Sequence, residues 1–126
     1  MKPAYFDLSV ENLKETRQFF ENVFGWHFEK MPLPFEYFRI QAGDSEEPGI
    51  DGGIGEVKDM PFSDGKPLCV VTIPVVNLDK SIAKVTESSG GVVEPKVTIS
   101  GIGWYATCAE PGGLMFGIMQ TDPEAR

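Results

Sequence analysis

The chain has 126 residues, of which 41% are hydrophobic and 24% charged, and this mixture is that of a globular protein rather than a disordered or fibrous one. The length suits one domain with its own core, and the net charge of −8 makes nucleic-acid binding unfavourable. No apolar stretch could cross a membrane and the amino terminus lacks signal-peptide features, so we expect a cytoplasmic protein whose two cysteines, Cys69 and Cys108, are free thiols.

The first half of the chain predicts a strand, a helix and three further strands. Residues 5–10 alternate between apolar and polar side chains, which is typical of a half-buried strand. Asn12 is a suitable N-cap, with Glu15 placed three residues later, and an apolar stripe then continues to a stop at Gly25. The three strands that follow are predicted at residues 26–30, 37–42 and 50–57, with a polar turn at 44–49.

The second half predicts the same series of elements. A strand at 68–75 precedes a helix that begins near Leu78 and stops before Gly90 and Gly91. Pro95 indicates that the next strand, at 92–97, lies at a sheet edge, because proline cannot donate a ladder hydrogen bond. A hairpin at 104–108 and 114–119 follows, and we expect the polar tail 121–126 to be frayed.

An internal repeat relates the two halves. Residues 10–16 (VENLKET) match residues 75–81 (VVNLDKS), and the same offset of 65 carries Gly25 onto Gly90. Near the end of each half, Glu-Pro-Gly at 47–49 matches 110–112, and Gly-Ile at 53–54 matches 117–118. We therefore interpret the chain as a single domain spanning 1–126, with modules at about 4–58 and 67–120 and a linker at about 59–66.

The chain contains one histidine, His27. A zinc site with three histidines from one chain is therefore excluded, as is an H-E-x-x-H helix. Any Ser-His-Asp or Cys-His device would have to use His27, but no serine or cysteine stands in a nucleophile-elbow context. We interpret His27 as a surface or structural residue.

The sequence resembles the vicinal oxygen chelate superfamily of glyoxalases, bleomycin-resistance proteins and extradiol dioxygenases. The residues that carry the resemblance are 10–13 (VENL), 19–26 (FFENVFGW), 90–91 (GG), 101–105 (GIGWY) and 110–114 (EPGGL). It covers the chain from about residue 5 to residue 120. The resemblance implies an α+β fold of two βαβββ modules that form a curved mixed sheet around a central hollow.

Metal-binding members of that superfamily hold a divalent ion through four side chains, one from the first and one from the last strand of each module. The resemblance places Tyr5, Gly53, Val70 and Gly117 at these positions. Valine and glycine side chains offer no donor atom and neutral tyrosine is a poor ligand, so we expect no metal and no other cofactor. A displaced site on Asp7 and Asp51 is the alternative, and two carboxylates would hold Mg²⁺ or Ca²⁺ only weakly.

We predict that the hollow binds a small organic molecule, cationic or aromatic, without a metal. Asp7 and Asp51 are predicted to face inward, where an ionised carboxylate is costly unless it meets water, a partner or a ligand. The candidate ligand-binding residues are Tyr5, Asp7, Asp51, Thr72, Trp104 and Met115.

Two other functions remain open at this stage. One is a lyase or isomerase that uses Asp7, Asp51 and Tyr5 as acid and base, or an atypical metal site. The other is a non-catalytic accessory dimer. For each of these functions we expect a homodimer, because two-fold dimers are the commonest closed assembly of small proteins.

Overall fold

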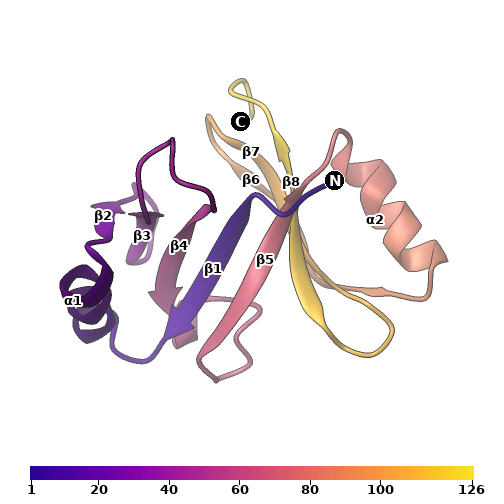
Figure 1. Cartoon of the computed structure of the whole chain (residues 1–126). Coiled ribbons are helices and arrows are strands. Elements are labelled where there is room, and N and C mark those ends of the chain that lie inside the picture. The colour runs from indigo at the N-terminus through magenta and orange to yellow at the C-terminus, as the bar shows by residue number, and fades with distance from the viewer. The chain divides into compact units, whose positions relative to one another are not determined.

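The computed structural model describes all 126 residues, which form two compact units (Figure 1). The first unit is Tyr5–Cys69, and the second combines Met1–Ala4 with Val70–Arg126. Each unit contains one helix and four strands in the order β-α-β-β-β, so the predicted pair of βαβββ modules is confirmed. Neither helix is long and apolar enough to cross a membrane.

The first unit consists of a four-stranded mixed sheet with one helix packed on it. Its strand order is β2-β3-β4-β1, in which β1 and β4 run parallel and the other pairs are antiparallel. The elements are β1 (Tyr5–Val10), α1 (Leu13–Phe24), β2 (His27–Lys30), β3 (Tyr37–Gln41), β4 (Asp51–Glu56) and the short 3-10 helix η1 (Val57–Asp59).

The core of the first unit lies between α1 and one face of this sheet. Leu13 of α1, Ile40 of β3 and Ile54 of β4 are buried there. Partly buried apolar residues surround them: Phe6, Leu8, Val10, Trp26, Phe28, Phe38 and Ala42. Because strand side chains alternate between faces, Tyr5, Asp7 and Ser9 of β1 lie on the opposite, helix-free face.

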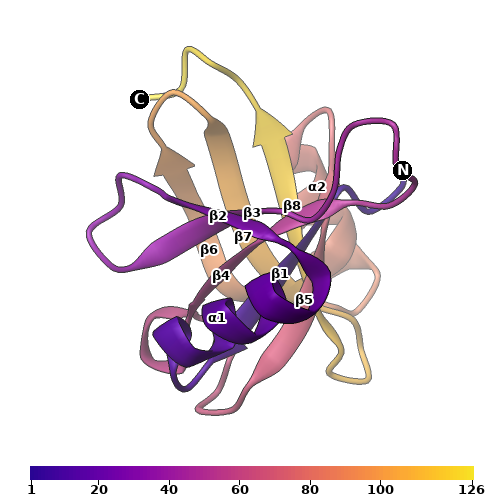
Figure 2. The same cartoon turned by 60° about the vertical axis from the view of Figure 1, so that its left-hand side comes forward.

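The second unit repeats this arrangement with the strand order β5-β8-β7-β6 (Figure 2). Its elements are β5 (Leu68–Pro74, which belongs to this unit from Val70 on), α2 (Leu78–Glu87), β6 (Gly91–Ile99), β7 (Gly103–Ala109) and β8 (Met115–Thr121). β6 is an edge strand, as Pro95 predicted, and its register to β7 is irregular on both sides of Glu94. The core forms around Leu78, Ala106, Cys108 and Ile118, on the face that α2 covers.

Equivalent asparagines cap the two helices. Asn12 Oδ1 accepts a hydrogen bond from the Glu15 amide, and Asn77 Oδ1 accepts one from the Lys80 amide, each at 3.0 Å. Gly25 caps the end of α1, and its φ of 71° is in the left-handed region that glycine adopts without strain. The repeat therefore extends to the atoms that start each helix.

The carboxyl-terminal tail is ordered, so the prediction of a frayed tail is wrong. Ala125 is 1% exposed, and its carbonyl accepts a hydrogen bond from the Gly101 amide at 2.9 Å. The Asp122 amide in turn donates to the Ile102 carbonyl at 2.8 Å. The tail is held mainly by backbone hydrogen bonds to the β6–β7 turn. The polarity of the side chains does not predict such bonds.

Candidate functional site

A buried carboxylate, a phenol and a glycine lie together on the helix-free face of the first unit. Asp7 is 8% exposed, and its Oδ1 accepts a hydrogen bond of 2.5 Å from the Tyr37 hydroxyl. Asp7 pairs with Gly53 in the parallel β1–β4 register. A Cβ added to Gly53 would overlap the Tyr37 hydroxyl and stand 2.8 Å from Asp7 Oδ1. Glycine at position 53 thus leaves the space that the tyrosine occupies.

Asp51 and Tyr5 lie next to one another at the rim of the same face. They are register partners at the start of β4 and β1, and Tyr5 is 44% exposed. Asp51 Oδ1 accepts a hydrogen bond from the Ala42 amide at 2.8 Å, while its Oδ2 lies 3.8 Å from the Arg39 guanidinium. Both predicted carboxylates therefore have partners within the chain, and Arg39 adds a positive charge that the sequence pattern did not place on this face.

The pKa of the Cys69 thiol depends on its burial and on the charge of Asp7. Desolvation raises the pKa of Cys69, and the negative charge of Asp7 raises it further. Burial likewise raises the pKa of Cys108, which is fully inaccessible. Both cysteines are free thiols. A raised pKa lowers the thiolate fraction at neutral pH, so neither cysteine has the character of an activated nucleophile.

The second unit carries an uncharged version of the first cluster. Thr72 of β5 and Thr107 of β7 are both register partners of Gly117 on β8. A Cβ added to Gly117 would overlap the Tyr105 hydroxyl and stand 2.8 Å from Thr72 Oγ1. Thr72 corresponds to Asp7, Tyr105 to Tyr37 and Gly117 to Gly53. Thr107, two residues after its tyrosine and opposite its glycine, occupies the place of Arg39.

Trp104 and Met115 lie on different faces of the second unit. Trp104 packs against the core that α2 covers, with Lys96 Nζ 5.9 Å from its ring centre. Met115 is half-buried and two residues from Gly117, so it shares the face of Thr72. Within the second unit, the structure therefore groups Met115 with Thr72 and separates Trp104 from both.

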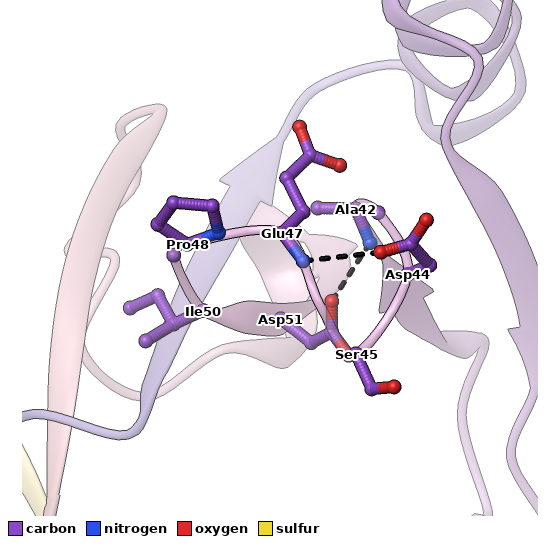
Figure 3. A pocket seen from close by; sticks show the side chains of 9 residues that line it. Ala42, Asp44, Ser45, Glu47, Pro48, Ile50 and Asp51 are labelled. Carbon is purple, nitrogen blue, oxygen red and sulfur yellow. Dashed lines mark hydrogen bonds between the residues drawn. The ribbon is translucent and has the colours of Figure 1, made fainter.

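A cavity of about 280 Å³ opens in the loop between β3 and β4 (Figure 3). Its polar lining includes Asp44, Ser45, Glu47 and Asp51. Asp44 Oδ1 accepts hydrogen bonds from the Glu46 and Glu47 amides at 3.0 Å, and the Asp51 carboxylate points to the Ala42 amide. These carboxylates thus shape the loop.

The four residues that the resemblance places at metal-ligand positions do not fit a divalent ion. Gly53 and Gly117 have no side-chain donor, Val70 is apolar, and Tyr5 carries a phenol at the rim. The space beside each glycine is taken by a tyrosine hydroxyl from the neighbouring strand. No three histidine, cysteine, aspartate or glutamate side chains gather as a metal-binding group.

Sequence reasoning missed Tyr37, Tyr105, Arg39 and Thr107. A signal for the tyrosines was present, because each stands on the strand before the Gly-Ile strand of its half. The register that places each hydroxyl over a glycine depends on the β3–β4 and β7–β8 pairings, which the residue pattern alone does not specify.

Comparisons with known proteins identify the fold. No family model and no curated protein matches the sequence. A hypothetical protein from Bacillus halodurans has a similar structure, with a TM-score of 0.72 and 14% identity over 99% of this chain and 97% of that one. A methylmalonyl-CoA epimerase variant from Streptomyces coelicolor, in complex with 2-nitronate-propionyl-CoA, is also similar. Its TM-score is 0.70 at 12% identity, over 96% of this chain and 97% of that one.

The methylmalonyl-CoA epimerase from Mycobacterium tuberculosis is similar to the same degree. Its TM-score is 0.67 at 12% identity, over 96% of this chain and 88% of that one. At such identities the likeness concerns the backbone rather than the site. The chain has the vicinal oxygen chelate fold, an α+β fold of paired βαβββ modules.

Proposed function

We propose that this chain binds a small organic molecule on the helix-free face of its first unit, without a divalent metal. The observation that supports this most is the buried Asp7 carboxylate, which the Tyr37 hydroxyl contacts above Gly53. In the proposal, the phenol and carboxylate replace a metal as the polar centre of the site. The glycines at positions 53 and 117 support the metal-free part of the proposal, since neither has a side chain that could coordinate a metal ion.

The favoured ligand carries a positive charge or hydrogen-bond donors. A carboxylate in a poorly solvated place attracts a cation more strongly than one in water. Arg39 lies beside Asp51 at the rim, so we assign the charged group of the ligand to Asp7. The half-buried Tyr37 and the exposed Tyr5 offer aromatic surface to the remainder of the ligand.

Matched probes test this assignment. Benzylamine, benzyl alcohol and benzoate share a ring and differ in charge, and we expect them to bind in that order in NMR titrations of the labelled protein. Asp7→Asn should weaken benzylamine by about 1–3 kcal/mol and leave benzyl alcohol nearly unchanged. Glu21→Gln removes one charge at an exposed position of α1 and serves as the control. If benzoate binds best, or Glu21→Gln acts like Asp7→Asn, the proposal is wrong.

An isomerase is the second candidate, and the 2.5 Å bond between Tyr37 and Asp7 favours it. A phenol and a carboxylate in this contact can serve as general acid and base for moving a proton on a carbon acid. Several proteins of similar fold are methylmalonyl-CoA epimerases. If this chain shares that activity, it will exchange the C2 proton of methylmalonyl-CoA in D₂O and Asp7→Asn will abolish the exchange. Pure binding predicts no exchange above a protein-free blank.

A further inference from the structure

Two buried threonine hydroxyls in the second unit have no hydrogen-bond partner. Thr72 is 2% exposed and Thr107 is 0% exposed, and the Oγ1 atom of each is unpartnered. A valine at either position would keep the shape of the side chain and remove the cost of burying a hydroxyl. The two hydroxyls are therefore available to a polar group that is not part of the chain.

Both hydroxyls lie on one face of the second unit's sheet, on the two strands that pair with Gly117. Thr72 and Thr107 flank Gly117 from opposite sides in the sheet, and the Tyr105 hydroxyl lies over Gly117 between them. With neighbouring strands about 4.8 Å apart, the two threonine backbones are about 10 Å apart. A single water molecule cannot bridge that separation, whereas an organic group of several atoms can.

From this arrangement we propose that the second unit contains its own binding site, formed by Thr72, Tyr105 and Thr107 around Gly117, for a neutral ligand that presents a carbonyl or amide group. Hydroxyls donate to a carbonyl oxygen without introducing charge. Met115 and Met119, two residues on either side of Gly117, supply thioether walls suited to an apolar or aromatic flank. Tyr105, on the same face, is half-buried.

The chemistry of this site differs from that of the first unit. Where the first cluster has Asp7 and Arg39, the second has two threonines, with the same tyrosine and glycine in both. Glu94 of β6 is the register partner of Thr107, so the two side chains share a face. Its carboxylate accepts from an amide N–H and repels an anion, which favours an amide over a carboxylate ligand. The inference rests on the unpartnered threonines and is independent of the function proposed for Asp7.

Methyl NMR tests the proposal with N-benzylacetamide as the probe. The Met115 and Met119 methyl signals report on this face, and we expect saturable shifts with a Kd of about 1–10 mM. The anionic 3-phenylpropanoate, of similar length, should bind at least about fivefold more weakly. Thr72→Val and Thr107→Val should each weaken the amide probe about fivefold or more. Thr98→Val, on an exposed part of β6, should leave its Kd unchanged.

The thermal midpoint of each variant without the probe supplies a second readout. If the hydroxyls serve a ligand that is absent, the Val variants should melt at the same or a higher temperature than the parent chain. Lower melting temperatures, with unchanged probe affinity, would show that the hydroxyls bond to internal water and would overturn the proposal. Equal binding of the amide and the anion would overturn it as well.

Discussion

At the scale of single residues, the glycine beneath each tyrosine hydroxyl is the most constrained feature of the two clusters. Gly53→Ala should destabilise the protein by about 1–3 kcal/mol, because its Cβ would overlap the Tyr37 hydroxyl. Tyr37→Ala removes the hydroxyl and the ring carbon that bears it, both of which the added Cβ would overlap, so the double variant should cost less than the sum of the single variants. Urea unfolding of the four proteins measures this coupling.

Gly91→Ala is the matched control, since an added Cβ there meets nothing within 4 Å. It should change the free energy of unfolding by less than about 0.5 kcal/mol. Strict additivity between Gly53→Ala and Tyr37→Ala would mean that the tyrosine side chain does not occupy this space.

Cys69 offers a residue-scale probe of the Asp7 charge. Because that charge raises the pKa of Cys69, Asp7→Asn should lower the pKa and shift the pH–rate profile of thiol modification toward lower pH. At a fixed pH below the pKa, Ellman's reagent should then react faster with Cys69 in the variant. Cys108 should stay unmodified in both folded proteins, since it is fully buried.

Glu21→Gln again provides the control, and its modification rate should equal that of the parent chain. A rate for Asp7→Asn equal to or slower than the parent rate would show that Asp7 is not ionised near Cys69.

At the scale of elements, the two helix caps should contribute alike. Asn12→Ala and Asn77→Ala each remove one side-chain acceptor from a helix amino terminus, at a cost of about 1 kcal/mol. Chemical denaturation measures both costs, and Asn22→Ala, an exposed position near the end of α1, is the control. A negligible cost at one cap and a full cost at the other would contradict the equivalence of the two modules.

The elements also show how far the sequence could predict the fold. Both caps, the edge position of β6 and the paired βαβββ order follow from local rules of capping, proline geometry and alternation. The ordered tail and the tyrosine positions depend on backbone pairings between distant segments. Trp104 illustrates the same limit, because only the observed register assigns it to the helix-covered core.

At the scale of the whole molecule, we predict a homodimer. Phe19, Val23 and Phe24 of α1 are each more than half exposed, which is a large apolar surface for a monomer. Light scattering at micromolar concentration should give twice the mass of one chain, which is 13.9 kDa. The mass of a single chain would contradict the prediction.

Calorimetry of the tag-free, EDTA-treated protein tests the central claim most directly, because that claim is ligand binding at Asp7 and Tyr37 without a metal. Benzylamine should bind with the same affinity before and after addition of Ni²⁺, Zn²⁺ or Mn²⁺, and none of these ions should bind at one site per chain with a Kd below about 1 µM. Benzylamine binding that appears only after a metal ion is added, together with stoichiometric metal binding, would contradict the account.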